Sequence, residues 1–150
     1  MICMKHILKK NLPFSRGRRT NSDEYYIIDL CDEILNQKAS RQHKFDFLIG
    51  DTGRKLPVDA YYEKLNLVVE YYEYQHDSSV PLFDKKMTVS GVSRDVQRRI
   101  YDQRRLDVLP KHGIDIVILR YIDFGLTKKL KRDVESDLKV INEKLKKYVM

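Results

Sequence analysis

Several features that would define a class of protein are scarce or missing in this chain. Its two cysteines, Cys3 and Cys31, are too few and too far apart for a disulfide framework or a zinc site. No apolar stretch is long enough to span a membrane, and Lys5 and His6 interrupt the apolar start, so we expect no signal peptide. The sequence also lacks internal repeats and low-complexity segments. These absences predict a soluble, cytoplasmic protein with reduced thiols.

Negative charge is missing from residues 1–22, which carry six lysines or arginines and no acid. Residues 23–91 carry thirteen acids against eight bases, and residues 92–150 return to fifteen bases against nine acids. An acidic centre between basic segments is typical of a protein that holds a metal in the middle and a polyanion around it. An unevenly charged, solvated surface is the alternative explanation.

The chain has the length of one domain, and its patterns divide it into three parts. Residues 1–22 form a basic N-terminal arm, and residues 23–123 hold the core. Residues 124–150 form a basic amphipathic helix, from about Leu126 to Tyr148. Its apolar stripe belongs to the core or to a dimer face, and consists of Leu130, Val134, Leu138, Ile141, Leu145 and Val149.

Apolar periodicity predicts the order helix-strand-strand-strand-helix-strand-helix, an α/β fold. The expected core elements are a helix from a cap at Asn21–Asp23 to Asn36, a polar loop over 37–44, strands over Lys44–Gly50, Leu56–Tyr62 and Leu65–Tyr74, a helix over Ser93–Lys111 and a strand over Ile114–Tyr121. Three strands with short links predict an antiparallel meander, and the fourth is expected to join by a crossover. Its continuous apolar sequence predicts burial on both faces.

The predicted hairpin over residues 56–76 contains acids inside apolar strands. Asp59 lies in the first run, and Glu70 and Glu73 lie in the second. Burying carboxylates beside one another is costly unless a positive charge compensates them, and a divalent cation is the usual remedy. We therefore expect the active site at this hairpin. A further acid, Glu24 on the first helix, could also reach this site.

Basic residues follow the hairpin and indicate nucleic-acid contacts. Arginine suits phosphate because its planar fork binds bidentately. The predicted DNA-binding residues are Lys85, Lys86, Arg94, Arg98, Arg99, Arg104 and Arg105. Acids on the same helix, Asp95, Asp102 and Asp107, could instead pair with several of these arginines. The buried positions of that helix are expected to be Val96, Ile100, Leu106 and Leu109.

The element order, the run Pro57-Val58-Asp59, an apolar strand ending at Glu70, and the pair Gln75-His76 together resemble the PD-(D/E)XK nuclease superfamily. The resemblance covers roughly residues 23–123 and is closest to a small branch with very-short-patch-repair-like and homing endonucleases. It implies a restriction-endonuclease-like αβββαβ core, a mixed sheet flanked by helices, with an extra C-terminal helix here. It also implies a DNA endonuclease of restriction or repair type that uses Mg²⁺, for which Mn²⁺ can substitute, with Asp59 and Glu70 as metal ligands.

The family lysine is missing, because its position two residues after Glu70 is occupied by Tyr72. One alternative takes Glu73-Tyr74-Gln75 as the motif. Another, which we prefer, keeps Glu70, places Gln75 or His76 around the water, and leaves Glu73 as a supporting or substitute ligand. The candidate catalytic residues are therefore Asp59, Glu70, Glu73, Gln75 and His76.

Three functions stay open from the sequence. The first is the metal-dependent endonuclease, for which a homodimer is expected because cutting both strands usually needs two sites. The second is a catalytically inactive DNA-binding module on the same fold. The third is an interaction subunit that dimerises through its C-terminal helix.

Overall fold

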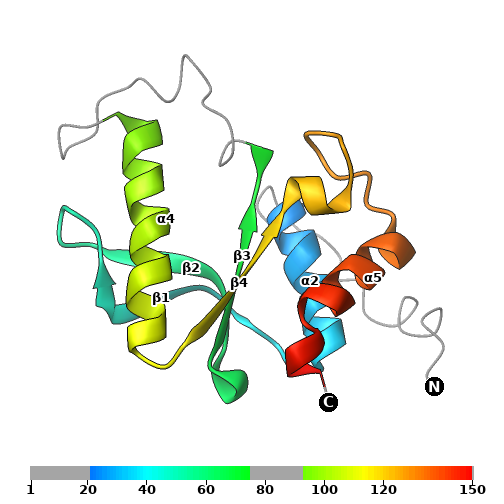
Figure 1. The fold of residues 1–150 in the computed structure, drawn as a ribbon, viewed down its shortest axis with the longest axis horizontal. Helices are drawn as coiled ribbons and strands as arrows, with labels where there is room; N and C mark the ends of the chain where they lie inside the picture. Colours follow the sequence, from blue (N-terminus) through cyan, green and yellow to red (C-terminus); the bar gives the residue numbers. More distant parts are fainter. Residues whose placement is uncertain (1–20, 75–92, 150) are drawn as a thin grey trace.

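The computed structural model describes residues 21–74 and 93–149, and its element order is the predicted one (Figure 1). Short 3-10 turns η1 (Glu63–Leu65), η2 (Tyr121–Phe124) and η3 (Lys146–Tyr148) join or follow the main elements. These main elements are α2 (Asp23–Leu35), β1 (Ser40–Ile49), β2 (Lys55–Tyr62), β3 (Leu67–Tyr72), α4 (Arg94–Lys111), β4 (Asp115–Arg120) and α5 (Val134–Lys144).

The four strands form one mixed sheet in the order β1-β2-β3-β4. Strands β1, β2 and β3 pair antiparallel as a meander, and β4 pairs parallel to β3 after α4 has carried the chain back. Both the meander and the crossover predicted from the sequence are therefore confirmed. The α/β class, with a mixed sheet and flanking helices, is confirmed with them.

Helices cover the sheet on both faces (Figure 1). On one face, Ile27 of α2 and Ile141 of α5 share a core with Val69 of β3. On the other face, Leu109 of α4 packs in a core with Val68. Side chains alternate along a strand. The side chain of Val68 therefore lies in the second core, and the first core receives those of Leu67, Val69 and Tyr71.

Strand bounds depart from the prediction at the sheet edges and in β3, which spans Leu67–Tyr72 rather than Leu65–Tyr74 because Leu65 belongs to η1. The expected loop over 37–44 is wrong in part, because β1 begins at Ser40, which pairs with Tyr61. The expected burial of the last strand on both faces is also wrong. Strand β4 is the last strand of the order, with one neighbour, and only its Leu119 is fully buried.

The C-terminal helix begins later than Leu126. Helix α5 starts after Asp133, whose side chain accepts a hydrogen bond from Ser136 N, while Arg132 has a φ of 57° that no helix accommodates. The apolar stripe nevertheless forms, since Leu138, Ile141 and Leu145 are buried against α2 and β3. The central part of the stripe thus belongs to this chain's own core, whereas Val149 at its end is exposed. No helix in the described part of the chain has the length and apolar character needed to cross a membrane.

Helix α4 starts after Ser93, as expected, and is less buried than predicted. Leu109 is buried and Leu106 half-buried, but Val96 and Ile100 are exposed. Figure 1 shows the reason, because the N-terminal half of α4 rises beyond strands β1 and β2 and only its C-terminal half covers them.

Candidate active site

Asp59 and Glu70 meet where strands β2 and β3 separate. Pairing between the two strands runs from Tyr62 with Leu67 to Ala60 with Val69. At the next position, Asp59 Oδ2 accepts a hydrogen bond of 2.8 Å from the backbone N–H of Tyr71. A side-chain oxygen here satisfies a strand amide, which fixes the direction of the Asp59 carboxylate.

The Glu70 carboxylate is buried on the α4 side of the sheet. Glu70 is only 5% exposed, and its Oε1 lies 3.4 Å from Arg105 Nε. That contact is within ion-pair range but lacks hydrogen-bond geometry, so within the described residues no donor bonds to Oε1. Burial first, and then the neighbouring Asp59 carboxylate, raise the pKa of Glu70 well above its ordinary value, while Arg105 opposes them. The two acids therefore favour a further positive charge between them.

Arg105 is the cation that α4 places beneath this pair. Its Nε donates to the Pro57 carbonyl at 3.1 Å, and its Nη1 donates to Asp102 Oδ1 at 3.1 Å. Its side chain is 14% exposed. Arg105 therefore lies against the site carboxylates, and its contact with DNA stays a prediction. A guanidinium does not lose its proton in a protein, so Arg105 can neutralise charge but cannot act as a base.

Gln42 is a site residue that the sequence did not reveal. Its Nε2 lies 2.7 Å from Glu24 Oε1 and 3.4 Å from Asp59 Oδ1, so one amide joins α2 to the site. Its φ of 51° is left-handed, an unfavourable conformation for a residue with a Cβ. Strain of this kind is maintained only where the surroundings impose it. No sequence pattern marks Gln42, because it lies in a polar run that predicts a loop.

Glu73 faces away from Glu70. It follows the end of β3 and lines a cavity of about 400 Å³ with Asp23, Tyr74 and Arg132, at the start of α2. Burial first, and then the charges of Asp23 and Glu73, raise the pKa of Tyr71, which is on the α2 side. Tyr72, at the family's lysine position, is buried, with the Arg120 guanidinium 5.7 Å from its ring centroid. Gln75 and His76 lie outside the described residues.

The predicted DNA-binding arginines of α4 divide into two groups. Arg104 and Arg105 are engaged with the body of the protein, since Arg104 donates to Ile49 O at 2.9 Å and pairs with Asp51 at 3.0 Å. Arg94, Arg98 and Arg99 lie in the first two turns, where Arg99 is 3.5 Å from Asp95. Asp95 and Asp102 do pair with arginines along the helix, whereas Asp107 accepts from Gln103. Lys85 and Lys86 lie outside the described residues.

Comparison with protein-family models found no matching family, and searches among curated proteins and solved structures found no similar protein. The site must therefore be interpreted from its own chemistry. Over residues 21–74 and 93–149, no three histidine, cysteine, aspartate or glutamate side chains form a group that could hold a metal ion. The candidate site in the described structure rests on two carboxylates, Asp59 and Glu70.

Proposed function

We propose that this protein is a metal-dependent DNA endonuclease with a restriction-endonuclease-like core, which hydrolyses phosphodiester bonds at Asp59 and Glu70. One observation carries the proposal. A buried glutamate lies beside a second carboxylate at the open end of a hairpin, with an oxygen to which no described residue donates a hydrogen bond. Such an arrangement is costly for a purely structural role and is typical of functional sites.

The residues present fit Mg²⁺. This ion prefers oxygen ligands and is usually bound through one or two carboxylates, with substrate phosphates completing its shell. Asp59 and Glu70 would hold it, and a third protein carboxylate is not required. When bound, Mg²⁺ polarises the phosphoryl oxygen and lowers the pKa of a water, and Mn²⁺ is expected to substitute.

The other residues act on these two acids. The Tyr71 N–H and the Gln42 amide orient Asp59, while Arg105 offsets part of the negative charge at Glu70. Arg105 thereby supplies a positive charge near the position where Tyr72 replaces the family's lysine. Gln75 or His76, which follow β3 in the sequence, are proposed to hold the attacking water.

Plasmid cleavage with Mg²⁺ or Mn²⁺ tests the proposal. Asp59→Asn and Glu70→Gln keep the shape of each side chain and remove its charge, so cleavage should fall about 100-fold or more while DNA binding is retained. Glu73→Gln is the matched control, because it makes the same change three residues further on and on the other face. EDTA should abolish cleavage by the wild type.

The control also decides between the two motif registers. If Glu73→Gln abolishes cleavage and Glu70→Gln does not, the acid belongs to the Glu73-Tyr74-Gln75 register and our site is wrong. Linear product rather than nicked circles would support the proposed homodimer, because both strands must then be cut.

The second candidate function is a DNA-binding module without catalysis. Tyr72 at the lysine position favours it, since the nearby Arg105 keeps its proton and cannot replace a lysine in proton transfer. This candidate predicts DNA binding without cleavage by either metal. The third candidate, a dimerising subunit, has less of the apolar stripe available to it, because Leu138, Ile141 and Leu145 are buried in the core.

A further inference from the structure

A cluster of cations lies between η2 and α5, at the same end of the molecule as the end of β3 (Figure 1). We call residues 126–132 the basic loop; its exposed cations are Lys128, Lys129, Lys131 and Arg132. The loop is fixed to the start of α2, where Asp23 accepts from Leu130 N at 3.1 Å and from Arg132 Nε at 3.0 Å. The lysines are thus presented by an anchored segment.

The charges of the basic loop are only partly neutralised. Arg132 pairs with Asp23, but over residues 21–74 and 93–149 no acid lies within ion-pair distance of Lys128, Lys129 or Lys131. Lys128 Nζ lies 4.7 Å from the centroid of the Tyr74 ring. Lys128, Lys129 and Tyr74 line the 400 Å³ cavity at the start of α2 together with Glu73. Three lysines in one loop without acidic partners favour an anionic ligand.

The basic loop also lies within reach of a DNA strand bound at the candidate site. Tyr74, beneath Lys128, follows Glu70 by four residues, which span at most about 13 Å. DNA rises about 3.4 Å per phosphate on each strand, so that span corresponds to roughly four nucleotides. A duplex at Asp59 and Glu70 that runs toward α2 would bring several phosphates to the lysines.

We propose that the basic loop binds the phosphate backbone of double-stranded DNA beside the scissile bond, on the α2 side of the site. This inference rests on the proposed nuclease function. It assigns a main part of the DNA-phosphate contacts to Lys128, Lys129 and Lys131. The described arginines of α4 were the sequence-based candidates, and Arg104 and Arg105 among them donate to backbone carbonyls of the protein itself. Leu126 is 95% exposed, but a single leucine does not form the apolar face that a membrane surface would need.

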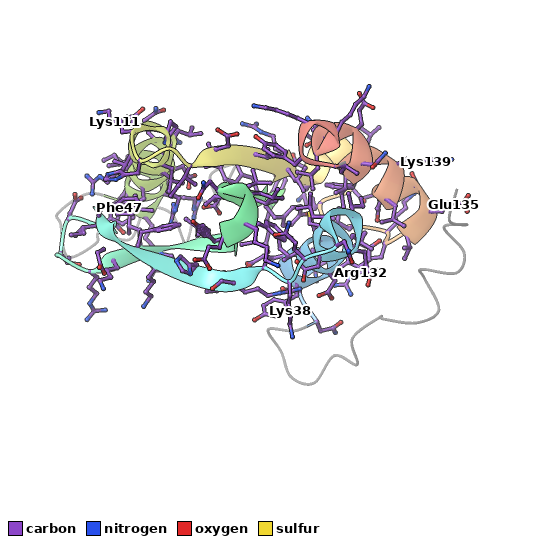
Figure 2. The ribbon with its side chains drawn as sticks, turned by 90° about the horizontal axis from the view of Figure 1, so that it is seen from below. Lys38, Phe47, Lys111, Arg132, Glu135 and Lys139 are labelled. Carbon is purple, nitrogen blue, oxygen red and sulfur yellow. The ribbon has the colours of Figure 1, made fainter. Side chains whose placement is uncertain are left out.

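Binding of a 30-base-pair duplex, followed by fluorescence anisotropy in EDTA from low to moderate salt, tests this inference. The test variant is Lys128→Ala, Lys129→Ala, Lys131→Ala. The matched control is Lys38→Ala, Lys111→Ala, Lys139→Ala, which removes the same charge from exposed lysines on three separate parts of the surface (Figure 2). Thermal unfolding verifies that both variants are folded.

The loop variant should bind DNA about 10-fold or more weakly, with the slope of log K against log salt reduced by about 2 to 3, because each lost phosphate contact removes about 0.9. The control should change affinity less than about 3-fold. Equal losses in both variants would overturn the inference, as would a wild type without DNA affinity. Equal affinity for duplex RNA would overturn the assignment to DNA. A wild type that binds through the loop but never cuts would reject the nuclease and, with it, the position beside a scissile bond, and would leave only the contact between the loop and DNA standing.

Discussion

Glu70 occupies an electrostatically costly environment, because its carboxyl is buried next to Asp59. Its pKa is raised in the folded protein, so between the ordinary glutamate pKa and the raised value the native state binds more protons than the unfolded state. The free energy of unfolding therefore falls as pH rises through that window, and the full cost remains above it.

Glu70→Gln should remove this cost. In EDTA the variant should be more stable than the wild type above the raised pKa, by about 1.4 kcal/mol for each unit by which the pKa is raised. The gain should vanish as pH falls below the ordinary glutamate pKa. Thermal unfolding from pH 4 to 8 measures it, with exposed Glu63→Gln as the control. A variant less stable than the wild type at pH 8 would contradict the role assigned to burial.

Gln42 combines a strained backbone with a bridging amide, and two substitutions separate these features. Gln42→Ala removes the amide and keeps the strain, whereas Gln42→Gly removes both. Cleavage and apparent Mg²⁺ affinity should fall about 10- to 100-fold in both variants, as for other residues that orient a metal ligand. Urea unfolding should show the glycine variant more stable than the alanine variant by about 1 kcal/mol. Wild-type Mg²⁺ dependence in both variants would mean that Gln42 does not position Asp59.

At the scale of elements, helices α5 and α4 differ in how deeply they bury an isoleucine. Ile141 is 0% exposed and contacts the core formed with α2, while Ile100 on α4 is 37% exposed. Ile141→Ala should lower the free energy of unfolding by about 2–4 kcal/mol, because it leaves a cavity, and Ile100→Ala by less than about 1 kcal/mol. Urea unfolding measures both. If Ile141→Ala instead leaves stability unchanged and dissociates an oligomer, the stripe is an interface.

The sequence predicted those elements whose pattern is local. The apolar period predicts α2 and the alternating burial of β2, whereas β3 is buried at every position because β2, β4 and helices on both faces surround it. The start of β1 was missed, because Ser40 and Arg41 are polar and are ordered by pairing with β2. The start of α5 was missed because Leu130 continues the apolar period, although Asp133 caps the helix three residues later.

In the candidate site, too, the residues that stand out locally in the sequence could be predicted and the others could not. Asp59 and Glu70 stand out as carboxylates within apolar runs, and β2 and β3 do bring them together. Gln42 carries no such contrast with its neighbours. The charge of Arg105 is evident in the sequence, but the direction of its side chain depends on how α4 packs over β2, which no spacing along the helix reveals.

Across the whole molecule, two kinds of strand pairing differ in the length of the chain segment that connects the paired strands. The β2–β3 pairs start at Tyr62 with Leu67, across the short turn η1, whereas β4 reaches Leu67 of β3 only after α4, through Asp115. Short loops close with little entropy cost and long ones with more. The hairpin can thus form first, from η1 outward.

The point where β2 and β3 separate therefore has a consequence for folding kinetics. Because pairing ends at Ala60 with Val69, the repulsive acids follow the last pair of the hairpin and do not oppose its nucleation. We expect Val69→Ala to slow folding and Glu70→Gln to act on the unfolding rate alone, which stopped-flow refolding and unfolding in urea would measure. Faster refolding of Glu70→Gln would show that the repulsion is already present in the transition state. The hairpin can therefore nucleate before the chain incurs the electrostatic cost of burying Glu70 beside Asp59.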